Sequence, residues 1–187
     1  MASSHEHDEA HHHEHDHVHD ASCDVAHGRA GAPAEDKVLV AVFASPVASY
    51  LLRYASDVGY RAVLVEPDPE LAKTALADGA ELAERTDLFP AGAADVVVTD
   101  HHREELGVQL RDALAGEARW VGIMGNPRHE GPHIKALAAL GVPDDEIDRV
   151  HRPIGLNIGS RTPAEIAIAT LAGLIADRNG KPGGFTF

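Results

Sequence analysis

Short apolar runs rich in β-branched residues alternate with helical segments, and this alternation constrains the fold more than any other feature. The candidate strands cover residues 38–44, 61–65, 94–100 and 119–125. The predicted helices cover residues 46–58, 71–82 (with Gly79 as an early stop), 106–114, 133–140 and 144–150, and a last helix begins at residue 163. Continuous apolar strands joined by helices predict a doubly wound, mostly parallel α/β sheet, Rossmann-like, with helices on both faces.

Residues 1–36 differ from the rest in composition, with nine acidic side chains and one arginine. High charge and low hydrophobicity predict a disordered tail and linker, so the folded domain is expected over residues 37–187. Imidazoles interleaved with carboxylates suit divalent Zn, Ni or Cu ions. The alternatives are adventitious binding and a solvated, pH-responsive tail. The candidate metal ligands are eight histidines: His5, His7, His11, His12, His13, His15, His17 and His19.

Overall composition argues against several classes of function. A formal net charge of -14 and a pI near 5.3 argue against nucleic-acid and anionic-membrane partners. Cys23 is the only cysteine, which excludes an intrachain disulfide. The chain has neither an apolar run long enough to span a bilayer nor the pattern of a secretory signal. We therefore expect a soluble cytoplasmic protein.

Polar side chains follow two of the predicted strands. In doubly wound sheets the ligand lies at the carboxyl ends of the strands. Asp100 and His101, with His102 beside them, follow one strand, and Asn126 and Arg128 follow another. Histidines relay protons and arginine binds phosphates, so these residues are candidate ligand contacts. The alternative is that Asp100 caps a turn and the histidines are exposed.

A loop with two glycines leads into the last helix. Thr162, Pro163 and Glu165 form a capping box with proline at the first helical position. Glycine permits close backbone approach, and a helix start offers unpaired N–H groups to an anion. The alternative is a tight loop into a buried helix. The candidate cofactor contacts in this loop are Gly155, Gly159, Ser160, Arg161 and Thr162.

The first turn, residues 43–48, lacks the glycines of a dinucleotide fingerprint. Ser45 is expected to cap the following helix. Glu66 stands where a ribose-binding acid belongs, but without the glycines it is weak support for NAD(P). An NAD(P)-dependent oxidoreductase is therefore the least favoured function.

Three segments resemble the xanthine dehydrogenase accessory (XdhC/CoxI) family: residues 98–101, 120–128 and 151–167. The last follows the string P-I-G-L-x-I-G-x-x-T-P-x-E-I-A, and the resemblance covers about residues 38–180. It implies a Rossmann-like C-terminal domain that binds molybdenum cofactor. It also implies help with sulfuration and insertion of that cofactor into a molybdenum hydroxylase such as xanthine or carbon monoxide dehydrogenase. The implied partners are this client enzyme and a cysteine desulfurase, and the implied role is that of a chaperone more than a catalyst. Many doubly wound domains dimerise, so a homodimer is a further expectation, although the sequence indicates no specific interface.

The resemblance suggests that the pterin phosphate lies on residues 155–162, oriented by Arg161, Arg128 and Asn126, while Asp100, His101 and His102 line the pocket. The chain departs from the family in three places. A His-rich tail replaces an N-terminal domain with a cysteine motif, the first turn keeps only Pro46-Val47-Ala48 of G-A-G-P-V-A, and Gly125-Asn126-Pro127-Arg128 replaces G-S-R. A second hypothesis therefore makes the tail a metal-delivery device and the domain its docking module.

Overall fold

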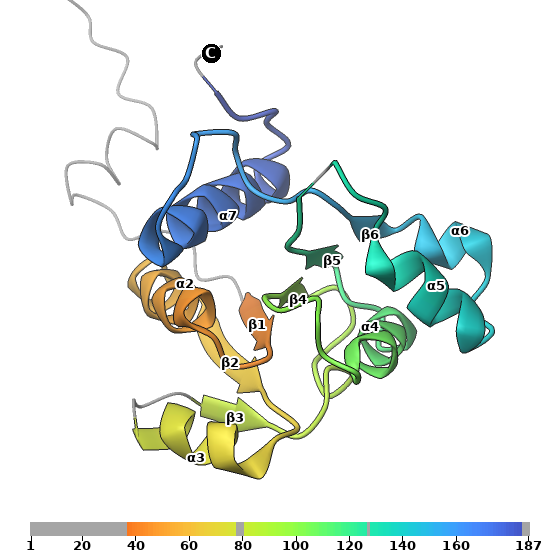
Figure 1. The fold of residues 1–187 in the computed structure, drawn as a ribbon. Coiled ribbons are helices and arrows are strands. Elements are labelled where there is room, and N and C mark those ends of the chain that lie inside the picture. The colour runs from red at the N-terminus through yellow and green to blue at the C-terminus, as the bar shows by residue number, and fades with distance from the viewer. Residues whose placement is uncertain (1–36, 78–80, 127, 185–187) are drawn as a thin grey trace, which may run out of the picture. The chain divides into compact units, whose positions relative to one another are not determined.

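One sheet of six parallel strands forms the centre of the computed structural model, which describes residues 37–77, 81–126 and 128–184. Its order is β3-β2-β1-β4-β5-β6 (Figure 1). The strands are β1 (Val38–Val42), β2 (Arg61–Val65), β3 (Glu81–Ala83), β4 (Ala94–Val98), β5 (Trp120–Ile123) and β6 (Val150–His151). All neighbouring strands pair in parallel, and the order reverses between β1 and β4. The predicted doubly wound α/β fold is confirmed.

Helices cover both faces of the sheet, as predicted. They are α2 (Pro46–Asp57), α3 (Pro69–Ala77), α4 (Leu106–Ala115), α5 (Pro132–Ala139), α6 (Asp144–Ile147) and α7 (Pro163–Arg178). In Figure 1, α2 and α7 pack together on one side of the sheet and α4 and α5 on the other. Successive strand side chains point to opposite faces, so Val40 packs in one core with Leu110, and Leu39 packs in the other with Leu51.

The helix expected over residues 71–82 is shorter than predicted. It ends at Ala77, and Glu81–Ala83 forms the edge strand β3 beside β2. Three residues with one large apolar side chain carry too little periodicity to identify a strand. The sheet supplies what the local pattern lacks, because β2 offers its free edge to these residues.

The segment expected as a helix over residues 144–150 also divides. The helix α6 ends at Ile147, and Val150 and His151 pair with β5 as the short strand β6. Ile147 and Val150 are both buried against the core on the α4 side. An apolar residue every third position fits a helix, but the open edge of β5 decides the conformation of Val150.

Two negative findings apply to the described part of the chain. No helix there is long and apolar enough to cross a membrane. No group of three His, Cys, Asp or Glu side chains among the described residues is arranged to hold a metal ion. The tail and its eight candidate ligands lie outside the described residues.

Candidate functional site

The β1–α2 turn is closed by its own side chains. Phe43 is fully buried and has a φ of 71°, a left-handed conformation that is costly for a residue with a Cβ. The Thr99 hydroxyl donates to the carbonyl of Phe43 at 2.8 Å, and the Ser45 hydroxyl donates to Thr99 at 3.0 Å. Ser45 also accepts the N–H of Ala48 at 3.0 Å, which confirms its predicted N-cap role.

Glu66, at the carboxyl end of β2, is fully engaged. Its side chain has no exposed surface. It accepts the N–H of Ala44 at 2.6 Å and that of Asp68 at 2.8 Å, and Arg103 donates to both of its oxygens at 2.9 and 3.3 Å. The Arg103 guanidinium also lies 4.7 Å from the centre of the Phe43 ring. Arg103 was not recognised from the sequence, because nothing local links it to Glu66.

Asp100, His101 and His102 form a turn at the end of β4. The N–H of His102 donates to the Asp100 carboxylate at 2.9 Å, which is the turn-capping contact considered as the alternative for Asp100. The two imidazole rings lie 4.1 Å apart. Burial lowers the pKa of His101; His102 and Arg152 lower it further, against Asp100 and a backbone hydrogen bond at Met124. The lowered pKa favours a neutral imidazole, able both to donate and to accept.

Asn126 and Arg128 follow β5 and are exposed, with the Asn126 side-chain oxygen accepting the N–H of Arg128 at 3.0 Å. The loop that carries them is held by Arg152, which donates to the carbonyls of Asn126 and His129, each at 2.8 Å. A Cβ on Gly125 would lie 2.8 Å from the Arg152 Nε, so glycine makes room for the guanidinium. Arg152 is a second residue that the sequence did not identify, although it lies in the segment 151–167 that resembles the family.

His133 lies beside this arginine and is buried, with 6% of its surface exposed. Its Nδ1 has no hydrogen-bond partner among the described residues, and neither has Nε of Arg152. Burial lowers the pKa of His133, and the charge of Arg152 lowers it further. The lowered pKa favours the neutral form of this imidazole, which lies next to the Arg152 cation.

Gly155, in the loop before α7, packs against that helix. Its φ is 84°, and an added Cβ would lie 3.0 Å from the backbone nitrogen of Thr170. The next residue, Leu156, donates its N–H to Ala169 at 3.0 Å. Gly155 also borders a hollow of about 230 Å³ that includes Trp120 and Ile154. The close approach predicted for Gly155 is thus an approach to α7, whereas Gly159 (φ 69°) has open space around it.

The start of α7 has the predicted capping box. Glu165 accepts the N–H groups of Arg161 and Thr162 at 2.6 and 3.1 Å, and Thr162 accepts the N–H of Glu165 at 3.3 Å. These backbone hydrogen bonds lower the pKa of Glu165. The Ser160 hydroxyl donates to the Glu165 carbonyl at 3.3 Å. Several donors that were expected to meet a ligand therefore bond to Glu165 instead. The Arg161 side chain is exposed. Ligand contacts by residues 155–162 stay a prediction.

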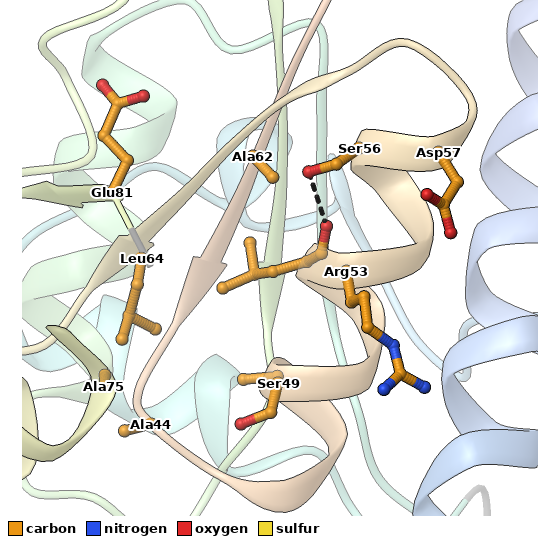
Figure 2. A pocket seen from close by; sticks show the side chains of 11 residues that line it. Ala44, Ser49, Arg53, Ser56, Asp57, Ala62, Leu64, Ala75 and Glu81 are labelled. Atoms are coloured by element: carbon orange, nitrogen blue, oxygen red, sulfur yellow. Dashed lines mark hydrogen bonds between the residues drawn. The ribbon is translucent and has the colours of Figure 1, made fainter. Parts of the chain in front are cut away.

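A cavity of about 480 Å³ lies elsewhere, between α2, β2 and α3 (Figure 2). Ala44, Ala62, Leu64 and Ala75 leave room in it because most of these side chains are small. The Ser56 hydroxyl donates to the Leu52 carbonyl at 3.1 Å, the dashed line in Figure 2. None of the residues predicted to bind a ligand lines this cavity.

Comparisons with known proteins place this geometry in a family. The model of the XdhC Rossmann domain matches residues 39–174. The chain is similar to a crystal structure described as a xanthine dehydrogenase from Bacillus halodurans, with a TM-score of 0.61 and 25% identity over 81% of this chain and 46% of that one. It is 33% identical over 101 residues to the uncharacterized protein YqeB of Escherichia coli K12, which is 54% of this chain and 18% of that protein. The chain therefore spans less than half the length of either relative. With a family model covering most of its sheet and helices, the chain belongs to the XdhC Rossmann domain family.

Proposed function

We propose that this protein is an accessory factor for a molybdenum hydroxylase such as xanthine or carbon monoxide dehydrogenase. It binds molybdenum cofactor and assists the sulfuration and insertion of that cofactor. Two findings support this function: membership of the XdhC Rossmann family and similarity to a structure described as a xanthine dehydrogenase. The single observation that carries the choice of site is the group of polar side chains after β4 and β5, of which Asp100 and His101 are half-buried and Asn126 and Arg128 are exposed.

The cofactor site in this proposal lies at the carboxyl ends of β4 and β5. Asp100 and His101 border it from β4, and Asn126 and Arg128 border it from β5. A pterin offers ring nitrogens and amide groups to neutral imidazole, amide and carboxylate partners, and its phosphate suits an exposed guanidinium. Arg161 is the second candidate for the phosphate, from the loop before α7.

The test is a titration of the full chain with molybdenum cofactor released from a purified molybdoenzyme, followed by pterin fluorescence and by molybdenum retained on gel filtration. Arg128→Ala and Arg161→Ala are each expected to weaken binding by about 1–3 kcal/mol, as for a lost charged hydrogen bond. Arg149→Ala is the matched control, because Arg149 is an exposed arginine at the amino end of β6, paired with Glu146. Equal affinity in Arg128→Ala and the wild type would remove the β5 loop from the site.

The client role needs its own measurement. Purified apo-hydroxylase is incubated with cofactor, a cysteine desulfurase and L-cysteine, with and without this protein. We expect faster recovery of hydroxylase activity when the protein is present, since it delivers cofactor in bound form. An unchanged rate would contradict the accessory function, whatever the cofactor titration shows.

The His-rich tail supports a second proposal, divalent-metal binding. Its eight histidines between His5 and His19 are interleaved with carboxylates, which suits zinc, nickel or copper. Calorimetric titration of the full chain with nickel and zinc is compared with a variant in which all eight are glutamine. Loss of uptake in the variant is expected, and equal uptake would place the metal elsewhere.

A further inference from the structure

In dinucleotide-binding proteins of this fold, the ligand lies between the first turn and the end of β2. In this chain, side chains of the domain itself bond to the groups at that position. In a dinucleotide site, glycines open the first turn to the pyrophosphate and an acid after the second strand meets the ribose. Phe43 and Ser45 stand at the positions of the first two glycines. Glu66 stands at the end of β2 with its side chain wholly buried.

Three contacts occupy the groups that a dinucleotide would use. The Ala44 N–H, in the turn, goes to the Glu66 carboxylate at 2.6 Å. The Ser45 hydroxyl takes the Ala48 N–H at the start of α2, where a phosphate oxygen would accept. Both oxygens of Glu66 receive the Arg103 guanidinium, so neither is left for a ribose hydroxyl.

Arg103 also links the loop after β4 to the end of β2. It follows His102 by one residue and precedes α4, so its ion pair fixes the loop at residues 99–105 against β2. Its side chain is 19% exposed, and its guanidinium packs on the ring of Phe43. The start of the loop is also held to β1, because the Thr99 hydroxyl donates to the Val42 carbonyl at 3.1 Å. At the other end, the Leu106 N–H donates to the Arg103 carbonyl in a local turn.

We infer that this chain has turned the dinucleotide crevice of its fold into an internal anchor: Glu66 holds Arg103, and with it the Asp100–His102 loop, while the closed turn excludes NAD(P). Arg103 and Glu66 are positioning residues for that loop. Neither consequence requires that the domain bind a pterin.

Exclusion is tested on the full chain by titration with NADH and NADPH, followed by nicotinamide fluorescence. We expect no saturable binding up to about 1 mM, the upper end of common enzyme affinities. Saturable binding of either nucleotide below that concentration overturns the exclusion.

Anchoring is tested by hydrogen exchange in Arg103→Met, which keeps the length of the side chain and removes its charge. The His102 amide, bonded to Asp100, is the reporter, and the β4 amides are the internal reference. We expect at least about tenfold faster exchange at His102 with little change in β4, because the loop opens locally. Arg111→Met, which removes an exposed arginine paired with Asp112 on α4, is the matched control and is expected to leave both unchanged.

A second readout separates positioning from general support. As the loop opens in Arg103→Met, the imidazole of His101 loses burial, so its NMR titration is expected to move up toward the ordinary value. Arg103→Lys keeps a cation but cannot donate to both Glu66 oxygens in the same way, so it is expected to retain part of the protection of the His102 amide. This variant replaces Arg103→Met in the test if Arg103→Met does not fold. Equal exchange at His102 in Arg103→Met and the wild type, or a uniform rise across the whole domain, overturns the inference.

Discussion

The two ends of the sheet each contain a buried carboxylate paired with arginine, but they use it differently. At the amino end, Asp95 has no exposed surface and receives Arg119 at 2.6 Å and Arg178 at 2.7 Å. Arg119 also pairs with Asp177 at 2.6 Å. Burial, and to a smaller extent the charge of Asp95, raises the pKa of Tyr60 to about 12. Asp95, Asp177 and the two arginines are thus paired with one another inside the domain.

At the carboxyl end some polar side chains are buried in internal ion pairs, while others are exposed. Glu66 is closed on Arg103, but Asn126 and Arg128 extend into solvent and His101 is partly exposed. The difference separates stability from binding: ion pairs that join elements at one end hold the domain, while the other end keeps groups available. We expect substitutions at the amino end to change the free energy of unfolding, and those at the open carboxyl positions to change ligand affinity.

The largest effect is expected for Asp95→Asn. Removing this charge leaves the partly buried Arg178 without its carboxylate and Arg119 with Asp177 alone, which costs about 3–5 kcal/mol of unfolding free energy. Urea unfolding followed by circular dichroism measures it, with Glu81→Gln as control because Glu81 pairs with Arg61 at the exposed sheet edge. A shift no larger than that of the control would mean that the amino end is no more important for stability than the surface.

A smaller effect is expected where the loop before α7 crosses that helix. Gly155→Ala combines an unfavourable φ with a Cβ 3.0–3.2 Å from the backbone of Ala169 and Thr170, and should lower the unfolding free energy by about 2–3 kcal/mol. Gly159→Ala meets open space and should cost only about 1 kcal/mol, from φ alone. Equal costs in urea unfolding would show that Gly155 is not a packing position.

The smallest effect is a pH dependence that belongs to the carboxyl end. The folded state lowers the pKa of His133 below its ordinary 6.5, so the unfolded state binds more protons as the pH falls past that value. The contribution of His133 to the unfolding free energy is therefore at its maximum above about pH 7.5 and declines toward about pH 5.5. In urea unfolding, His133→Gln should make the decline in unfolding free energy between these two pH values less steep. Part of the decline remains in this variant, because the pKa of His101 is lowered as well. A slope identical to that of the wild type would contradict this assignment.

The predictions that succeeded depend on local chemistry. Strands such as Val38–Val42 are continuous apolar runs, and the caps at Ser45 and Thr162 need only a hydroxyl and an N–H a few residues apart. Those that failed depend on a distant partner. Glu81–Ala83 becomes a strand because β2 has a free edge, and a three-residue pattern cannot indicate that.

The candidate site divides in the same way. Placing Asp100, Asn126 and Arg128 after β4 and β5 required only the apolar runs that predict these two strands, and the structure has them there. Their contact with a ligand stays a prediction. Arg103 and Arg152 were missed, because their partners Glu66 and Asn126 lie 37 and 26 residues away. Nothing in the neighbouring sequence marks an arginine that reaches so far.

The sequence by itself determined the class of fold, the caps and the absence of glycines from the first turn, since each follows from residue types at fixed spacing. Only the tertiary structure decided which internal partner each polar group or glycine of the candidate site meets. In the folded domain, the Glu66 carboxylate pairs with Arg103, Gly155 packs against α7, and the N–H groups of Arg161 and Thr162 donate to Glu165. A buried polar group must find a partner, and which partner it finds depends on the elements that folding brings beside it.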